Sequence, residues 1–203
     1  MNLPKSSPLK SSYVRSHELA FRTESRLLIV DVQEKLVPMI AHYERMLGNC
    51  RRLIQGAKIL DVPVFATEQY PKGLGHTVAP LAELLGPVPD KQRFSCAEVL
   101  DWGLAAEQAD NRFQIVVAGI EAHVCVLQTV LDLLAGGFQV FVPADAISSR
   151  GEFDCKIALD RMSSGGAVIT TTESVLFEWC EQSGTPEFKQ ISQLIKESDK
   201  GSN

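Results

Sequence analysis

Short apolar segments alternate with longer amphipathic segments along most of the chain. Runs of Val, Ile, Leu and Ala bounded by turn residues are typical of buried strands, and apolar residues recurring every three to four positions are typical of helices. On these patterns we predict strands at residues 26–31, 62–67, 93–96, 114–120, 139–142 and 167–171, the third of them short. We predict helices at residues 45–60, 99–109, 123–135, 153–163, 174–182 and 186–197, and a long loop with one short helix at 68–85.

Strands that alternate with helices form parallel sheets with right-handed crossovers, and the helices cover both faces of the sheet. We therefore expect an α/β protein with three α/β/α layers and a six-stranded, mostly parallel sheet in the order 3-2-1-4-5-6. Residues 1–24 are polar and rich in Ser, and they include Pro4 and Pro8. For this reason we expect an extended N-terminal arm at residues 1–24 before a single domain at residues 25–203.

The composition is that of one globular domain with a substantial core, since 45% of the 203 residues are hydrophobic and 22% are charged. A net charge of −5 disfavours nucleic acid and anionic membranes as partners. The polar start of the chain lacks the apolar segment of a signal peptide, and no apolar run reaches the length of a membrane span. Five cysteines without C-x-x-C spacing predict neither a disulfide framework nor a zinc site, which favours a reducing, cytoplasmic location.

Cys125 occupies the position where a nucleophile is expected in such a fold. The apolar run Gln114–Ile120 predicts a central strand, and the helical pattern that follows places Cys125 in the first turn of a helix. The unpaired N–H groups and the dipole at a helix start favour an anion, so we expect a lowered thiol pKa. The alternative is a small buried hydrophobe, but Cys125 aligns with Gln128, Thr129 and Asp132 on the polar stripe between two apolar helix faces.

Two further residues are predicted at the same edge of the sheet, where the carboxyl ends of parallel strands gather. Asp31 ends the first strand, and Lys91 comes just before the third. A carboxylate that accepts the thiol proton and a lysine that stabilises both anions would complete a site around Cys125. Taken singly, Asp31 could instead cap a helix and Lys91 could be a solvated surface charge.

Six motifs, in their order along the chain, make it resemble the isochorismatase-like cysteine hydrolase superfamily from Arg26 to about Lys196. They are Leu-Ile-Val-Asp-Val-Gln at 28–33, Ala-Thr-Glu-Gln-Tyr-Pro at 66–71, Lys-Gln-Arg-Phe-Ser at 91–95, Gly-Ile-Glu-Ala-His-Val-Cys-Val at 119–126, Asp-Ala-Ile-Ser-Ser-Arg at 145–150 and Ser-Gly-Gly-Ala at 164–167. The order Asp…Lys…Gly-Ile-x-x-x-x-Cys-Val is specific in combination. Within the superfamily, the chain is most similar to the isochorismatase domain-containing proteins.

The resemblance implies a catalytic triad, with Asp31 as base, Lys91 as electrostatic support and Cys125 as nucleophile. It also implies a cis peptide bond between Ile120 and Glu121. This bond would turn the Glu121 N–H toward the site, beside the Cys125 N–H, so that the two groups form an oxyanion hole. The side chain of Glu121 would then be incidental to the chemistry.

Departures from the superfamily pattern narrow the expected chemistry. Nicotinamidases of the superfamily bind a metal through an Asp and two or more His after the second strand, whereas this chain has Glu68–Pro71 and only His76 there. We therefore expect no metal, and the absence of both glycine-rich nucleotide motifs predicts no other cofactor. Isochorismatases that hydrolyse a vinyl ether do not need the cysteine, so Cys125 favours covalent acyl chemistry on an amide-like C–N bond.

We interpret the chain as a hydrolase of a small molecule that acts on a non-peptide C–N bond through a Cys125 thioester. Gln33, Gln69 and Phe94 are candidates for substrate binding, although the glutamines could equally tie down loops and Phe94 could belong to the core. Two other functions stay open: isochorismatase-type hydrolysis of an ether, and a non-enzymatic interaction or scaffold role. The superfamily commonly forms oligomers, so the resemblance also implies a homo-oligomer.

Overall fold

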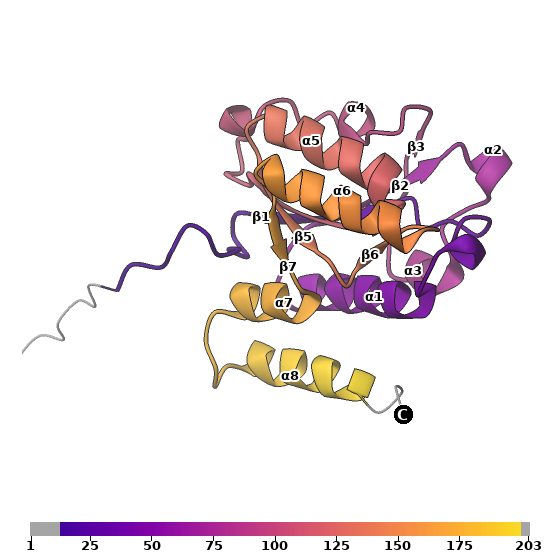
Figure 1. Ribbon diagram of the computed structural model, residues 1–203. Coiled ribbons are helices and arrows are strands. Elements are labelled where there is room, and N and C mark those ends of the chain that lie inside the picture. The colour runs from indigo at the N-terminus through magenta and orange to yellow at the C-terminus, as the bar shows by residue number, and fades with distance from the viewer. Residues whose placement is uncertain (1–12, 200–203) are drawn as a thin grey trace, which may run out of the picture.

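A seven-stranded sheet lies between two layers of helices in the computed structural model, which describes residues 13–199 (Figure 1). The order is β3-β2-β1-β4-β5-β7, with β6 paired to β4, and every pairing between these strands is parallel. The strands are β1 (Ser25–Val30), β2 (Val64–Gln69), β3 (Asp90–Lys91), β4 (Gln114–Ile120), β5 (Gln139–Pro143), β6 (Ile147–Ser148) and β7 (Val168–Thr170). The predicted three-layer fold and strand order are confirmed, with β7 as the predicted sixth strand. The two-residue β6 was not predicted.

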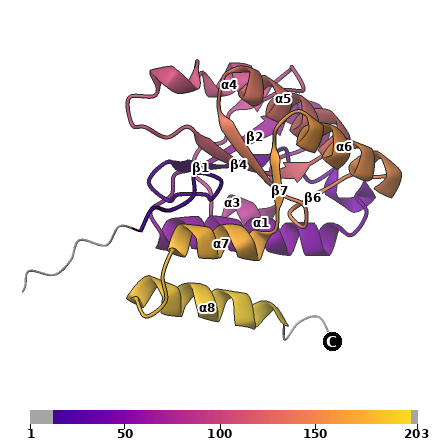
Figure 2. The same cartoon turned by 60° about the vertical axis from the view of Figure 1, so that its left-hand side comes forward.

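Helices α5 and α6 cover one face of the sheet, and α1 and α7 cover the other (Figure 1, Figure 2). Helix α8 lies outside the second layer and packs on α1 and α7. The longer helices are α1 (Tyr43–Ile59), α5 (Leu127–Ala135), α6 (Glu152–Ser164), α7 (Thr172–Cys180) and α8 (Pro186–Asp199). Short helical segments lie in the connections: η1 (Val37–Met39), α2 (Pro71–Leu74), α3 (Ala79–Ala82), α4 (Ala97–Leu100), η2 (Ala105–Glu107) and η3 (Ala122–Val126).

The two central strands, β1 and β4, are covered by helices on both faces. Every residue of both strands is buried, which is typical of a parallel sheet with helices on each side. One core cluster lies between the sheet and α1, α7 and α8. It includes the fully buried Trp179, whose Nε1 donates to Oγ of Ser25 at 2.9 Å. The other cluster lies between the sheet and α5 and α6, and it includes Cys96 and Cys125.

The position predicted for the third strand is wrong. The strand is Asp90–Lys91, which pairs with the end of β2, and residues 93–96 form a loop instead. The reason is that the backbone carbonyls of Arg93 and Phe94 turn inward and accept hydrogen bonds from the Lys91 ammonium. In a strand at 93–96, these carbonyls would instead have pointed sideways, toward a neighbouring strand of the sheet.

All the predicted helices differ from the observed ones by a residue or more at their ends, and two of them also differ in kind. The helix predicted at 99–109 is reduced to α4 and η2, because Asp101 and Gly103 adopt left-handed backbone conformations that end the first helix. The helix predicted from residue 123 begins one residue earlier as the π-helical turn η3 and continues as α5. Cys125 lies within η3, and π-helical turns of this kind are frequent at functional sites.

Residues 1–12 of the predicted N-terminal arm lie outside the described part of the chain. Residues 13–24 contain no helix or strand, and they pack against their own domain. The N–H of Ala20 donates to Oε2 of Glu178 at 2.7 Å, and the N–H of Phe21 donates to Oε1 of Gln114 at 2.7 Å. Ala20 is fully buried in this contact. The described part of the arm is therefore held by the domain that follows it.

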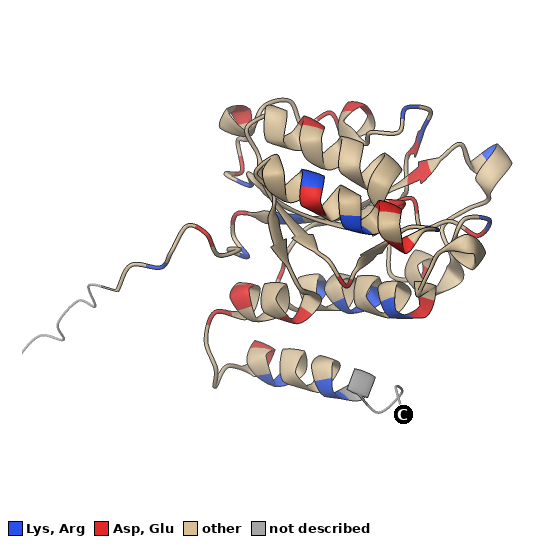
Figure 3. Cartoon of the chain, in the orientation of Figure 1, with Lys and Arg blue, Asp and Glu red and all other residues tan. Residues whose placement is uncertain are grey.

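Charged side chains of both signs are distributed over the outer helices (Figure 3). Lys and Arg are interspersed with Asp and Glu along α6 and α8, whereas α1 carries Glu44 near its start and only basic charged residues after it. Within residues 13–199, no helix combines the length and the apolar character that crossing a bilayer requires.

Candidate active site

Three polar side chains from separate elements meet at the carboxyl edge of the sheet. Asp31 follows β1 with a φ of 50°, Lys91 ends β3, and Cys125 lies in η3 after β4. Nζ of Lys91 lies 2.7 Å from Oδ2 of Asp31, and the charges of both residues act on the Cys125 thiol. The fold thus brings together the three residues that the sequence nominated.

The ammonium group of Lys91 is enclosed by acceptors. The side chain of Lys91 is 3% exposed and that of Asp31 is 0% exposed. Besides Asp31, Nζ contacts Oε1 of Gln69 at 2.7 Å, the carbonyl of Phe94 at 2.8 Å and the carbonyl of Arg93 at 3.2 Å. These contacts fix the cation beside Asp31, and they exclude the alternative that Lys91 is a solvated surface charge.

The thiol of Cys125 does not have the lowered pKa that its helix position predicted. Burial raises the pKa of Cys125, and the charge of Asp31 raises it further, against an opposite effect of Lys91. A helix start stabilises a thiolate where little desolvation opposes it, but Cys125 is 6% exposed and belongs to an apolar cluster. At rest the site therefore holds a neutral thiol that interacts with the Asp31 carboxylate, so that Asp31 is placed to accept its proton.

One feature that the resemblance implies for the proposed oxyanion hole, its cis peptide bond, is present. The peptide bond between Ile120 and Glu121 is cis. The Glu121 side chain accepts hydrogen bonds from the backbone N–H of Arg150 at 3.2 Å and from its Nε at 3.0 Å. The side chain of Glu121 thus ties the end of β4 to the turn after β6, while its N–H and that of Cys125 are the proposed oxyanion donors.

Gln33 and Gln69, two candidates for substrate binding, are occupied by contacts within the protein. Gln33 is fully buried, donates through Nε2 to the carbonyls of Gln69 and Gly75, and accepts the Gln69 N–H at 2.7 Å. The side chain of Gln69 accepts from Lys91 and donates to the carbonyl of Gln92 at 2.8 Å. These contacts favour the other interpretation, in which both glutamines tie down the loops around Asp31 and Lys91.

Phe94, the third candidate, is 51% exposed, which excludes a core role. Its carbonyl holds Lys91, so its ring projects from a loop that is anchored at the site. Phe94 therefore stays a candidate for an apolar wall that contacts substrate.

The loop that binds a metal in nicotinamidases is held here by hydrogen bonds around Glu68. Oε1 of Glu68 accepts the N–H of Thr77 at 2.6 Å and its hydroxyl at 2.8 Å, and Oε2 lies 3.0 Å from Nδ1 of His76. Although burial acts to raise it, these contacts lower the pKa of Glu68. Among the described residues, no group of three or more His, Cys, Asp or Glu side chains is arranged to hold a metal ion.

One residue of the site was not anticipated from the sequence. Oγ1 of Thr67 donates to Oδ1 of Asp31 at 2.8 Å, on the side of the carboxylate opposite Lys91. Thr67 pairs in parallel register with Val30, the residue before Asp31. A polar residue near the carboxyl end of a strand that neighbours β1 was the signal that could have identified it.

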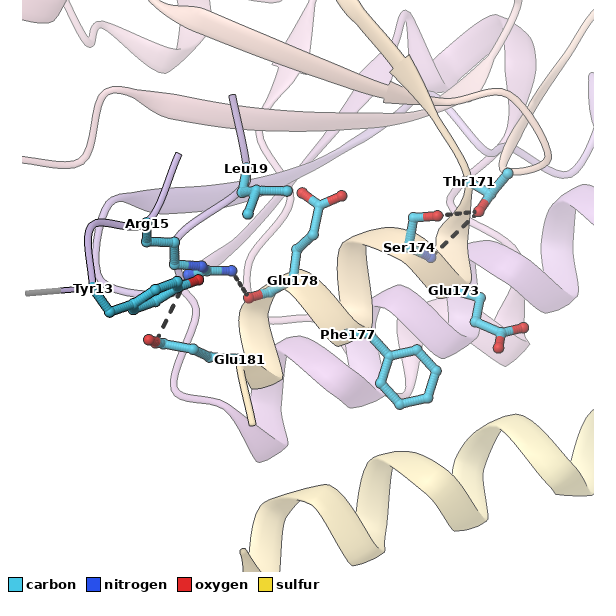
Figure 4. A pocket seen from close by; sticks show the side chains of 9 residues that line it. All are labelled: Tyr13, Arg15, Leu19, Thr171, Glu173, Ser174, Phe177, Glu178 and Glu181. Atoms are coloured by element: carbon cyan, nitrogen blue, oxygen red, sulfur yellow. Dashed lines mark hydrogen bonds and ion pairs between the residues drawn. The ribbon is translucent and has the colours of Figure 1, made fainter. Parts of the chain in front are cut away.

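A cavity of about 540 Å³ lies between the N-terminal arm and α7 (Figure 4). Tyr13, Arg15 and Leu19 line one side of it, and Phe177 and Glu181 of the α7 region line the other. None of its lining residues belongs to the Asp31, Lys91 and Cys125 cluster. The size of this cavity therefore gives no reason to move the candidate site away from the carboxyl edge of the sheet.

Comparison with known proteins agrees with the geometry. Residues 25–174 match the sequence profile of the Isochorismatase domain. The chain belongs to the isochorismatase family. Isochorismatase domain-containing protein 2A of Mus musculus is 41% identical over 177 residues, which cover 85% of this chain and 83% of the mouse protein. Isochorismatase domain-containing protein 1 of Salmo salar is 42% identical over 172 residues, which cover 83% of this chain but only 59% of the salmon protein.

A solved structure extends the isochorismatase-family likeness to three dimensions. The MAR1 ribonuclease from Caenorhabditis elegans is 40% identical, with a TM-score of 0.80 over 87% of this chain and 92% of that one. The family match runs from the start of β1 into α7, so it contains all three residues of the site.

Proposed function

We propose that this isochorismatase-family protein is a cysteine hydrolase that cleaves an amide-like C–N bond of a small molecule. The observation that carries the proposal is the buried Lys91 ammonium 2.7 Å from the Asp31 carboxylate, with both charges acting on the Cys125 thiol. A nucleophile, a base and a fixed cation in contact are the components of nucleophilic acyl transfer. Because desolvating the two charges costs stability, the burial of this ion pair beside the thiol favours a catalytic role over a scaffold role.

In the first half-reaction, Asp31 accepts the thiol proton while the sulfur of Cys125 forms a bond with the carbonyl carbon of the substrate. The raised pKa of the thiol means that proton transfer accompanies the attack. The N–H groups of Glu121 and Cys125 hold the resulting oxyanion. Protonated Asp31 then gives its proton to the leaving nitrogen, the C–N bond breaks, and ammonia or an amine departs from the thioester.

Water completes the cycle by cleaving the thioester. Asp31, now a carboxylate again, removes a proton from water as the water oxygen bonds to the thioester carbon. The C–S bond breaks, the carboxylic acid leaves, and the proton on Asp31 returns to the sulfur of Cys125. Each turnover thus consumes one water molecule and hydrolyses one C–N bond. Lys91 stabilises the negative charge in the site throughout.

A screen of small amides, ureides and carbamoyl compounds for ammonia release tests this proposal. We expect release with wild-type protein and its loss in Cys125→Ala and in Asp31→Asn. Ammonia release that survives Cys125→Ala would contradict the thioester route. A vinyl ether of the isochorismate type belongs in the same screen, because its hydrolysis does not need the thiol and would favour the ether alternative.

A short RNA is a necessary further substrate in the screen, because the C. elegans relative is named a ribonuclease. The net charge of −5 favours a small molecule over a polyanion. If the wild type cleaves RNA and Cys125→Ala does not, RNA would be the substrate of this site in place of a compound with an amide-like C–N bond.

The proposal includes a reducing compartment and a homo-oligomer. All five cysteines are free, as a cytoplasmic protein requires. The homo-oligomer rests on the superfamily resemblance, and light scattering over a range of protein concentrations tests it. A monomer at every concentration would remove this part of the proposal.

A further inference from the structure

Behind the pair formed by Asp31 and Cys125 lies a chain of buried polar groups that the proposed reaction does not consume. Oγ1 of Thr67 donates to Oδ1 of Asp31 at 2.8 Å and lies 3.2 Å from Sγ of Cys96. A hydroxyl has one proton, and here it goes to the carboxylate, so the Cys96 thiol donates to the Thr67 oxygen. Burial raises the pKa of Cys96 to about 11, which keeps this donor protonated.

A second branch ties Cys96 to the segment that carries the nucleophile. The N–H of Cys96 donates to Oγ1 of Thr129 at 2.9 Å, and that hydroxyl donates to the carbonyl of Cys125 at 2.7 Å. Thr67, Cys96 and Thr129 are 1%, 0% and 0% exposed, so water does not compete for these bonds. The electrostatic interaction between the Cys125 thiol and Asp31 closes these contacts into a ring of five residues.

We propose that Thr67 and Cys96 are positioning residues, and that this ring sets the orientation and the ionised state of Asp31. Each carboxylate oxygen of Asp31 has its own donor, Lys91 on Oδ2 and Thr67 on Oδ1. Donors on both oxygens prevent rotation of the carboxylate and favour its charged form, which keeps it available as a proton acceptor. The inference rests on the proposed hydrolase function, but its main measurement needs no substrate.

The test is the pH profile of Cys125 alkylation by iodoacetamide, followed by mass spectrometry, in wild type and in variants of Thr67. Thr67→Val keeps the shape of the side chain and removes the donor, whereas Thr67→Ser keeps the donor. Loss of a hydrogen bond to a charged group should move the acid-side midpoint of the profile upward by about one pH unit in Thr67→Val. Thr67→Ser should restore the wild-type midpoint. For any amide that the wild type cleaves, Thr67→Val should lower kcat about tenfold or more and change KM less.

Cys96 provides a second arm of the same test. Cys96→Ala removes the donor to Thr67 and should move the midpoint in the same direction by a smaller amount, because Asp31 keeps its own two donors. Cys96→Ser retains a donor and should restore the profile. The Cys96 variants stay informative if Thr67→Val folds poorly, and a thermal melt shows whether it does.

Thr172→Val is the matched control. Thr172 is 1% exposed and its Oγ1 donates to Oδ1 of Asp145 at 3.0 Å, the same kind of contact outside the ring. The control should leave the midpoint in place even where it lowers stability. An unmoved midpoint in folded Thr67→Val and Cys96→Ala would overturn the inference. Asp31→Asn distinguishes failure of this inference from failure of the proposed function. This variant should abolish the acid-side midpoint of the alkylation profile. An unchanged profile in Asp31→Asn would show that Asp31 is not the base.

Discussion

Nζ of Lys91 lies 2.7 Å from Oδ2 of Asp31, and the two side chains are 3% and 0% exposed. A buried ion pair of this kind is costly to desolvate, and removing one partner leaves an uncompensated charge in the interior. The pair nevertheless places a fixed carboxylate beside the thiol of Cys125. The buried pair thus costs stability but holds the base in one position, and unfolding experiments can measure that cost.

Breaking the ion pair should destabilise the fold as well as abolish turnover. Lys91→Met leaves the Asp31 carboxylate buried without its cation, and we expect a loss of about 3–5 kcal/mol in the free energy of unfolding. Adding Asp31→Asn to Lys91→Met should recover part of that loss. Urea unfolding measures both variants.

The surface pair formed by Lys156 and Asp160 serves as the control for this experiment. It has a similar separation of 2.8 Å, but its side chains are 71% and 61% exposed. Lys156→Met should cost less than about 1 kcal/mol, because water screens an exposed pair. Equal costs for Lys91→Met and Lys156→Met would contradict the burial of the pair at the site.

Alkylation near neutral pH should label Cys155 before Cys125. Cys155 is the more exposed thiol, whereas burial and then the charge of Asp31 raise the pKa of Cys125. Mass spectrometry after brief iodoacetamide treatment measures the order. Faster labelling of Cys125 in the wild type would show that the thiol is already activated at rest.

The stability of the fold should fall in alkaline solution because of its buried thiols. Burial and then Asp145 raise the pKa of Cys50 from 9.0 to about 12, and burial and then Asp31 raise that of Cys96 to about 11. A raised pKa leaves stability unaffected below the unfolded value and reduces it as pH rises above 9.0, because the unfolded thiol ionises first. Each such thiol should cost about 1 kcal/mol per pH unit in that range.

Urea unfolding at a series of alkaline pH values tests this expectation, and Cys50→Ala is the informative variant. Removing one of the thiols should make the dependence of the free energy of unfolding on pH less steep above pH 9.0, the ordinary value of a thiol. The same slope in Cys50→Ala and in the wild type would mean that other groups control alkaline unfolding.

Gly119→Ala should be poorly tolerated. Gly119 has a φ of +117°, and a Cβ there would lie 2.2 Å from the carbonyl oxygen and 2.7 Å from the nitrogen of Val30. Both are backbone atoms of the central strand β1, so neither can move without disturbing the segment that carries Asp31. We expect a loss of about 3 kcal/mol or more in the free energy of unfolding, together with loss of activity.

Gly48→Ala is the matched control, because nothing lies within 4 Å of the Cβ that it would add. Gly48 lies inside α1, where Ala is the better helix former, so this variant should gain about 0.5–1 kcal/mol in urea unfolding. A Gly119→Ala variant as stable as the wild type would contradict the close approach of β1 and β4.

The sequence pattern was sufficient for the elements whose side chains face a core. β4 is a continuous apolar run that is buried on both faces, and the long helices carry apolar residues at helical spacing, so burial alone accounts for both. Because parallel strands present their carboxyl ends at one edge, the same reasoning placed Asp31 and Cys125 near each other. The short β3 was missed, since two residues have no period and its place depends on Lys91 reaching the carbonyls of Arg93 and Phe94.

The sequence by itself thus determined the layer order of the fold, the edge of the sheet at which chemistry is expected, and the residue types available there. Only the tertiary structure decided how those residues act. Gln33 and Gln69 are used by loops, and Thr67 turned out to contact Asp31 directly. The direction of the pKa shift at Cys125 was also decided in space, because a local helix start is outweighed by desolvation and by a carboxylate from a different strand. Periodicity reports which side of an element is buried, whereas hydrogen bonds and charges depend on distances between elements that lie far apart in the chain.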